Sequence, residues 1–334
     1  MSEVRSTIKH VYRGLPTAAK VLLWTSIVFV VAELGLRLLV RSLDIEHGLY
    51  QADAAAEWRT KANLALQIDV NKPPLHFRAN TNHLGLRGDG VLPPKAPGER
   101  RIVILGDSFT WGIGVESNQT FPEVLERKLA ESGVKNVKII NAGMPSYGTV
   151  HELAFHRAYS AELGADAIVL AYYPNDDDDN SVPYRFLDGY IWRDPTLIFG
   201  QPSFVVELVV QRTRLGLQKT GLWQPKNRPD GRALSLKLIG EVQQSCAENH
   251  WPFFVLDIPA RESTKFVAPF ERATPFRPLD VSSEYLITMR DEVERLSESP
   301  YLEEHHLNPA GHELTAQVLT KALSQRLPWA TGKP

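Results

Sequence analysis

The chain has 334 residues, 43% of them hydrophobic and 23% charged, which is enough for one large folded domain with appendages. The net charge of −2 provides no electrostatic basis for binding nucleic acid, so we expect no such partner. The single cysteine, Cys246, excludes an intrachain disulfide, and no cysteine–histidine cluster in the sequence indicates a metal site. We expect no metal and no cofactor.

An apolar stretch of 20 residues, Val21–Val40, follows a basic leader. As a helix it would span about 30 Å, the thickness of the hydrocarbon core of a bilayer. Glu33 and Arg37 interrupt it four residues apart, on one helix face, where they can pair. We predict that residues 1–41 form a basic leader and a single-pass membrane anchor. The N-terminus would lie inside, and the rest of the chain would be periplasmic or extracellular.

Two alternatives compete with the anchor. The most apolar part, Val21–Ala32, has only 12 residues and ends in a sequence that a signal peptidase could cleave. The stretch could also be a buried amphipathic helix of a soluble protein. In addition, Arg37 and Arg41 lie on the far flank and weaken the orientation predicted from the leader.

Residues 42–98 show little periodicity and end in a proline-rich run, and we interpret them as a juxtamembrane strap. The first clear strand is Ile102–Leu105, an apolar run of the kind buried in a parallel sheet. It stops at Gly106, so Asp107 and Ser108 fall in the next turn. All three residue types favour ordinary turns, and we expect the Asp107 side chain to fix this one through local backbone hydrogen bonds. A serine at this place nevertheless projects into the crevice where open α/β sheets bind ligands.

Helices and strands alternate after this turn. We predict a helix that starts at Thr120, with Glu123 completing a capping box, and then a strand at Val137–Gly143. A helix at about 150–163 leads to a third strand, which ends at Asn175. Strands that alternate with helices in this way predict an α/β fold of three layers with a doubly wound parallel sheet.

Residues 176–235 interrupt the alternation with aromatic and proline-rich sequence, and we predict a cap-like insertion over the strand ends. The insertion begins with four aspartates, Asp176–Asp179. Carboxylate oxygens are suitable calcium ligands, but the glycine and the terminal glutamate of a calcium loop are missing. A solvated loop is therefore the better interpretation.

The alternation then resumes with a helix at about 233–249, a strand at 252–259 and a helix at about 282–297. Asn308 and Pro309 are expected as the N-cap and the first residue of the last helix, which runs to about Arg326. The domain predicted in this way covers residues 99–328.

Four blocks occur in order along this domain: Gly-Asp-Ser at 106–108, Gly143, Asn175, and Glu303-Glu-His-His-Leu-Asn-Pro-Ala-Gly-His312. In this order and spacing they resemble the SGNH (GDSL-like) hydrolase family, over about 230 residues from Arg101 to Leu327. The resemblance implies the flavodoxin-like SGNH hydrolase fold. A run farther upstream, Asn80–Arg87, resembles a segment of membrane-tethered members of the family, and we expect it to be a packed arm.

The resemblance implies that Ser108 is a nucleophile. A serine hydroxyl needs a base to remove its proton, and histidine is the side chain best suited to that task near neutral pH. His306 holds the family position of the base, with His305 and His312 as nearby competitors.

The position of the acid is occupied by Glu303, where the family usually has aspartate. Glu303 would orient the imidazole of His306, although Glu304 or a backbone carbonyl can fill this role instead. By the same resemblance, the oxyanion hole consists of the Ser108 N–H, the Gly143 N–H and the side-chain amide of Asn175.

These expectations describe a membrane-anchored serine esterase that acts outside the cytosol on an ester or O-acyl group, O-acetyl included. One alternative is an O-acyltransferase that modifies an envelope polysaccharide, because both reactions pass through the same acyl-enzyme. Another is a non-catalytic carbohydrate-binding domain that kept the fold. The sequence identifies neither the substrate, glycan or otherwise, nor any protein partner, nor the residues that bind the substrate.

Overall fold

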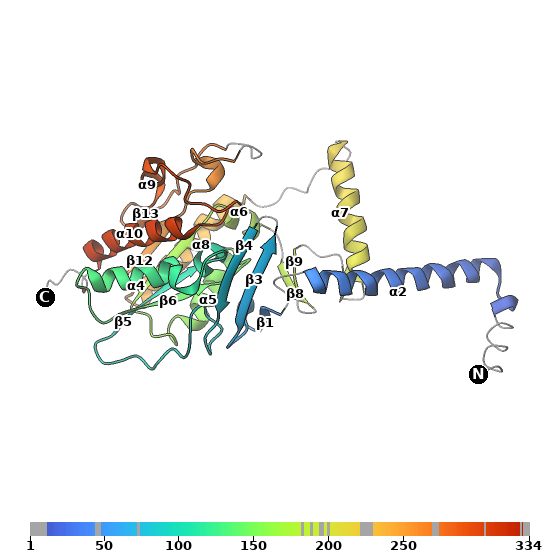
Figure 1. Ribbon diagram of the computed structural model, residues 1–334, viewed down its shortest axis with the longest axis horizontal. Coiled ribbons are helices and arrows are strands. Elements are labelled where there is room, and N and C mark those ends of the chain that lie inside the picture. Colours follow the sequence, from blue (N-terminus) through green and yellow to red (C-terminus); the bar gives the residue numbers. More distant parts are fainter. Residues whose placement is uncertain are drawn as a thin grey trace. The chain divides into compact units, whose positions relative to one another are not determined.

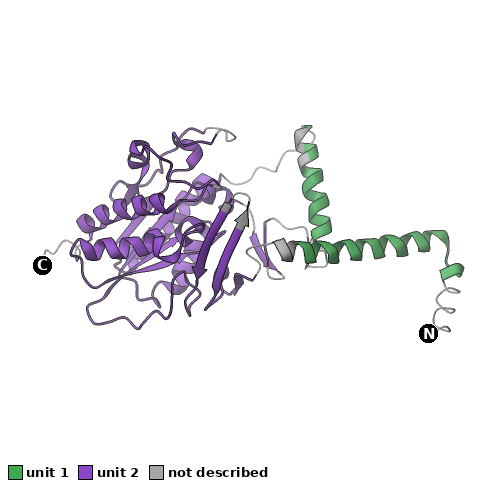
Figure 2. Ribbon diagram, in the orientation of Figure 1, with its two compact units in different colours: residues 1–47, 194–226 green, residues 48–193, 227–334 purple. Residues whose placement is uncertain are grey.

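The computed structural model describes residues 12–43, 48–71, 74–181, 184–187, 190–193, 197–198, 201–220, 230–268, 274–303, 305–327 and 329. The chain divides into two compact units, shown in Figure 2. The smaller unit combines Met1–His47 with Asp194–Lys226, and the larger unit combines Gly48–Arg193 with Asn227–Pro334. Each unit is described by itself.

A five-stranded parallel sheet forms the centre of the larger unit (Figure 1). Its strands are β5 (Arg100–Gly106), β6 (Val137–Gly143), β7 (Ala167–Tyr172), β12 (Phe253–Asp257) and β13 (Leu286–Thr288). Their spatial order is β13-β12-β7-β5-β6. If the five strands are numbered 1 to 5 along the chain and read from the β6 edge, the order is 2-1-3-4-5, the flavodoxin-like order. The topological switch point lies between β5 and β7. The predicted doubly wound sheet is therefore confirmed.

Helices cover both faces of this sheet. In β5, Ile102 and Ile104 pack into one hydrophobic cluster and Val103 and Leu105 into another, because successive side chains of a strand point to opposite faces. The helices α4 (Phe121–Glu131) and α10 (Pro309–Arg326) contribute to the first cluster. The helices α5 (Thr149–Tyr159) and α8 (Gly231–Glu248) contribute to the second. The result is the expected arrangement of three layers.

The helix predicted at about 282–297 is wrong. Its first part is the edge strand β13, which pairs with Val255–Asp257 of β12, and only Arg290–Arg295 form a helix, α9. A three-residue strand is too short for a period-2 pattern, so its hydrogen bonds to β12 decide its conformation. A further correction concerns Thr120, which is the N-cap of α4 but makes no capping hydrogen bond through its side chain. Its hydroxyl donates to the carbonyl of Ser117 instead.

The segment predicted as a strap contains two antiparallel hairpins. One pairs β1 (Tyr50–Asp53) with β2 (Glu57–Thr60), and the other pairs β3 (Ala65–Asn71) with β4 (Pro74–Asn80). Trp58 and Phe77 are buried in the same hydrophobic cluster as Val103 of the central sheet. These hairpins are thus part of the core of the larger unit.

The predicted insertion is divided between the two units. The short helix α6 (Asn175–Asn180) and the hairpin of β8 (Tyr184–Leu187) and β9 (Tyr190–Arg193) belong to the larger unit. The hairpin of β10 (Leu197–Ile198) and β11 (Gln201–Pro202) and the helix α7 (Phe204–Lys219) belong to the smaller unit. The four aspartates form part of α6, and two of them, Asp176 and Asp179, are buried, so the prediction of a solvated loop is wrong.

The smaller unit contains the long helix α2 (Thr17–Leu43). Its residues Thr17–Leu39 are long and apolar enough to cross a membrane, and none of the apolar window is buried inside the structure. That exposure does not fit the alternative of a buried core helix. Nε of Arg37 lies 2.8 Å from Oε1 of Glu33, which confirms the predicted ion pair.

Candidate active site

The turn after β5 places a serine at the carboxyl edge of the sheet, beside the topological switch point. Gly106 has a φ of +157°, and a Cβ atom at this position would lie 2.1 Å from Oγ1 of Thr110, so only glycine fits. Oδ1 of Asp107 accepts a hydrogen bond from the N–H of Phe109, at 2.8 Å, which confirms its predicted role in the turn. Ser108 is then the first residue of the short helix α3 (Ser108–Trp111).

His306 reaches this serine from the other end of the chain. Its Nε2 atom lies 2.8 Å from Oγ of Ser108. The loop before α10 holds the histidine in place, because the N–H of Leu302 donates to the carbonyl of His306, at 2.7 Å. Asn308 caps α10, as predicted, by accepting from the N–H of Gly311 at 2.9 Å. The 2.8 Å between Nε2 of His306 and Oγ of Ser108 is the hydrogen-bond distance that a nucleophile–base pair requires.

The two competing histidines have different positions. His312 is buried in α10, and its Nδ1 atom accepts a hydrogen bond from the N–H of Phe121, at 3.1 Å. Burial lowers the pKa of His312 to about 3. His305 is exposed, and its ring stacks on that of His306 with centroids 4.7 Å apart. Of the three histidines, His306 is the one that the structure joins to Ser108.

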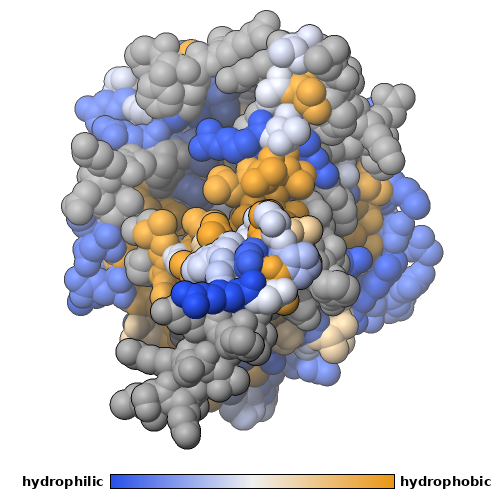
Figure 3. Space-filling view, turned by 90° about the vertical axis from the view of Figure 1, so that its right-hand side faces the viewer, coloured by the Kyte–Doolittle hydropathy of each residue, from blue (hydrophilic) through white to orange (hydrophobic). Residues whose placement is uncertain are grey.

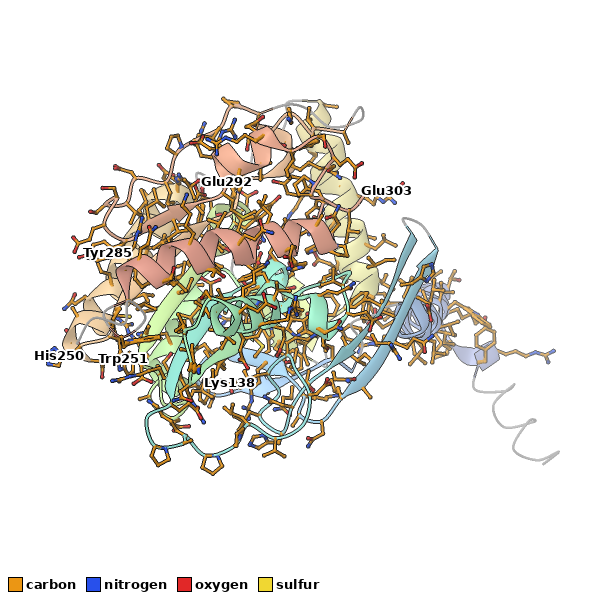
Figure 4. All side chains as sticks on the ribbon, turned by 60° about the vertical axis from the view of Figure 1, so that its left-hand side comes forward. Lys138, His250, Trp251, Tyr285, Glu292 and Glu303 are labelled. Carbon is orange, nitrogen blue, oxygen red and sulfur yellow. The ribbon has the colours of Figure 1, made fainter. Side chains whose placement is uncertain are left out.

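Glu303 is exposed, and its side chain extends away from the ribbon in Figure 4. Its backbone carbonyl accepts a hydrogen bond from Arg261, at 3.1 Å. Among the residues that the structure describes, no hydrogen bond or ion pair joins the carboxylate of Glu303 to His306. The geometry expected of an orienting acid is thus not present at Glu303. Its neighbour Glu304 lies outside the described residues.

Asn175 follows β7 and begins α6, on the other side of the switch point. Its Nδ2 atom donates to Oδ2 of Asp107, at 3.0 Å, and to Oδ2 of Asp179, at 3.2 Å. Tyr184 in turn donates to the other oxygen of Asp179, at 2.6 Å. The amide predicted for the oxyanion hole is therefore held between two carboxylates, one of which belongs to the serine turn.

Gly143 ends β6 directly beside the serine helix. A Cβ atom there would lie 2.4 Å from the backbone nitrogen of Trp111, so the close approach of α3 to β6 requires glycine. The N–H of Gly143 donates to Oδ1 of Asn141, at 3.0 Å. Nδ2 of Asn141 donates to the carbonyl of Thr110, at 2.9 Å. Asn141 thus joins β6 to α3, and our sequence analysis gave this residue no role, because an asparagine inside an apolar strand carries no spacing signal.

Three interacting acids are buried: Asp107 of the serine turn, Glu152 of α5 and Asp176 of α6. Burial raises the pKa of Asp107 to about 6, because a charged carboxylate loses its hydration inside the protein. Burial also raises the pKa of Glu152 and that of Asp176, and the negative charges of these acids oppose one another. The hydroxyl of Thr149 donates to Oδ2 of Asp176 at 3.2 Å. Burial and mutual repulsion thus make all three carboxyl groups bind protons more tightly than they would in water.

Arg87, from the upstream run that we expected to be a packed arm, lies behind the same helix. Its guanidinium is 4.3 Å from the centre of the Trp111 ring and donates to the carbonyl of Val115, at 2.8 Å. Burial lowers the pKa of Arg87 to about 10. An arginine that stacks on an aromatic face and reaches a carbonyl fixes the far side of α3.

The sequence matches no protein-family model, and no curated protein matches it significantly. Solved structures are similar to this chain at low identity and with TM-scores below 0.5. A GDSL-like lipase from Bacteroides thetaiotaomicron has 12% identity, with 71% of this chain and 93% of that chain covered and a TM-score of 0.40. The lipase/acylhydrolase from Enterococcus faecalis has 15% identity, 68% and 96% coverage and a TM-score of 0.33. A two-domain esterase active on acetylated mannans has 15% identity, 71% and 51% coverage and a TM-score of 0.39.

Proposed function

We propose that this chain is a serine hydrolase of the SGNH type that cleaves an ester or O-acyl bond. The observation that supports the proposal is the 2.8 Å contact between Oγ of Ser108 and Nε2 of His306. It lies at the carboxyl edge of a doubly wound sheet, where such folds bind ligands. We also propose that α2 anchors the protein in a membrane and that the larger unit lies outside the cytosol.

The reaction proceeds in two halves. In the first, Nε2 of His306 takes the hydroxyl proton of Ser108 while Oγ bonds to the carbonyl carbon of the ester. The tetrahedral intermediate collapses when the bond to the alcohol breaks and His306 returns the proton to the departing oxygen. In the second half, His306 takes a proton from water, whose oxygen attacks the acyl-enzyme. The carboxylic acid leaves, and Ser108 regains its proton.

The developing oxyanion needs N–H donors. The N–H of Ser108 is the first of α3 and so has no acceptor within that helix. The amide of Asn175 and the N–H of Gly143 donate to side chains in this structure, so they would exchange those acceptors for the oxyanion. Hydrogen bonds of a catalytic site often tighten only when substrate binds.

Labelling with a fluorophosphonate tests the proposal. Full-length protein in detergent should become covalently labelled, and Ser108→Ala and His306→Ala should abolish labelling and the hydrolysis of a small activated ester. Ser324→Ala removes a half-buried serine of α10 and serves as the matched control, which should retain both. Labelling of Ser108→Ala at the wild-type rate would refute the assignment of the nucleophile.

A further inference from the structure

The carboxylate of Glu33, inside the apolar stretch of α2, binds the start of a second helix. Oε2 of Glu33 accepts from the N–H of Val205, at 3.0 Å, and from the hydroxyl of Ser203, at 2.9 Å. Oε1 accepts from the N–H of Phe204, at 3.2 Å. The first N–H groups of α7 have no acceptor within their own helix, and a negative charge at this end is favourable. Glu33 therefore caps α7.

Arg37 completes the same junction. It donates to Oε1 of Glu33, at 2.8 Å, and to the carbonyl of Pro202, at 3.0 Å. Its guanidinium lies 5.5 Å from the centre of the Phe204 ring. A carboxylate and a guanidinium are costly in lipid unless they are paired and hydrogen-bonded. The start of α7 supplies the partners that the two charged groups of α2 need, so it is fixed at the level of Glu33 and Arg37.

This level is near the end of the candidate membrane span. Thr17–Leu39 are the residues long and apolar enough to cross a membrane. At 1.5 Å per residue, Glu33 lies about 24 Å along the helix from Thr17. The hydrocarbon core of a bilayer is about 30 Å thick. Resting on the proposed anchoring by α2, with Thr17 at one boundary of the hydrocarbon core, the start of α7 lies within about 6 Å of the other boundary, on the side away from the leader.

The sequence of α7 places an apolar face beside a polar strip. Val205, Val206, Val209, Val210 and Leu217 fall on the apolar face at helical spacing. Glu207, Gln211 and Arg214 form the adjacent polar strip, and Phe204 and the 49% exposed Leu208 lie beyond it. Val209 is 58% exposed and Leu217 is 37% exposed. Arg212 lies at the edge of the apolar face, where a long basic side chain can reach lipid phosphate while its stem stays on apolar surface.

Figure 1 shows α7 running crosswise to α2, and Figure 3, which faces the N-terminal end of α2, shows hydrophobic side chains on α2 and above it on α7. We propose that α7 lies in the headgroup layer of the membrane, with the face that contains Val209 and Leu217 in the acyl boundary. A helix with an apolar face and a polar strip, fixed at the end of a membrane span, has the properties of an interfacial helix. The membrane then contacts the chain at two places in the sequence. These are α2, which precedes Gly48, and α7, which lies between the two sequence segments of the larger unit.

Spin labels at two positions of α7 test this proposal. Cys246 is the single cysteine and is buried, so Cys246→Ala gives a background for labelling. Val209→Cys and the matched control Gln211→Cys, each carrying a nitroxide, are placed in the full-length protein in vesicles of phosphatidylcholine and phosphatidylglycerol. The label at 209 should collide often with oxygen, which concentrates in lipid, and rarely with a water-soluble nickel chelate. The label at 211 should show the reverse.

Two results would overturn the proposal. Equal access of the nickel chelate to both labels would place α7 in water, and exclusion of both reagents from position 209 would mean that protein covers this face. The variant Glu33→Leu tests the junction separately, because it makes α2 more apolar and keeps the protein in the vesicle. Without its cap, α7 should leave the headgroup layer, and the label at 209 should become several-fold more accessible to nickel. Unchanged access would show that Glu33 does not position α7.

Discussion

Nδ1 of His312 accepts a hydrogen bond from the backbone N–H of Phe121, at 3.1 Å, although the two residues are 191 positions apart. Phe121 is the first residue of α4, so its N–H has no acceptor within the helix. Only a neutral ring can accept here, and burial keeps the ring neutral by lowering the pKa of His312 to about 3. His312 therefore stabilises the layer of α4 and α10.

This cap predicts a dependence of stability on pH. The folded pKa of His312 lies below its value of 6.5 in an unfolded chain, so the unfolded chain binds the proton more tightly. The contribution is complete above about pH 6.5 and is lost as pH falls, by about 3 kcal/mol between pH 6.5 and pH 4. His312→Asn keeps an acceptor oxygen near the same place and should remove this part of the dependence. Denaturant unfolding at several pH values measures it, and equal slopes in both proteins would contradict the prediction.

For Glu303 we predict a small effect on catalysis. Its carboxylate is exposed and, in the described part of the chain, makes no contact with His306, so Glu303→Gln should keep the turnover of an activated ester within about threefold of wild type. Loss of a required acid would lower turnover by up to about 10⁴. Glu304→Gln, measured beside it, shows whether the neighbouring glutamate has the role instead. A large loss in Glu303→Gln alone would restore Glu303 as the acid.

Asn175→Ala should slow catalysis strongly if its amide stabilises the oxyanion. Removal of one such donor costs about 10²–10³ in turnover, with little change in substrate affinity. Asn118→Ala is the control, because Asn118 is an exposed asparagine of the short helix after α3. Steady-state kinetics of the two variants on one ester decide the matter. A change in KM with unaltered turnover would mean that Asn175 binds substrate but does not stabilise the transition state.

Gly143→Ala should destabilise the larger unit and displace the serine helix. The added methyl group would meet the backbone nitrogen of Trp111 at 2.4 Å and Cβ of Thr110 at 2.7 Å. Such crowding costs about 1–3 kcal/mol. Gly240→Ala is the matched control, since nothing lies within 4 Å of its added methyl group, and alanine favours a helix interior by about 0.5–1 kcal/mol. Thermal unfolding should thus shift in opposite directions. A shift of the same sign in both would argue against a close approach of α3 to β6.

Membrane attachment should survive extraction with alkaline carbonate, because Thr17–Leu39 form one exposed apolar helix. We expect full-length protein in the membrane fraction. Its release in full length into the soluble fraction would remove the anchor from consideration. A mature N-terminus at Glu33 would identify a cleaved signal instead.

Much of this structure was predictable because it depends on neighbours along the chain. The apolar run Ile102–Leu105 is buried on both faces, and Asn308 caps the helix that begins with Pro309. The ion pair of Glu33 and Arg37 follows from four-residue helical spacing. In each case the residues that determine the conformation lie within one or two turns of one another, so their spacing can be read directly.

What only the tertiary structure decided depends on residues far apart. The contact of Ser108 with His306 joins positions 198 apart, and it separates His306 from two neighbouring histidines that the sequence alone could not exclude. The three-residue strand β13 exists through its hydrogen bonds to β12. Glu33 binds the start of α7, about 170 positions away, which no local pattern predicts. Such contacts form when burial brings distant groups together and leaves each N–H or carboxylate in need of a partner.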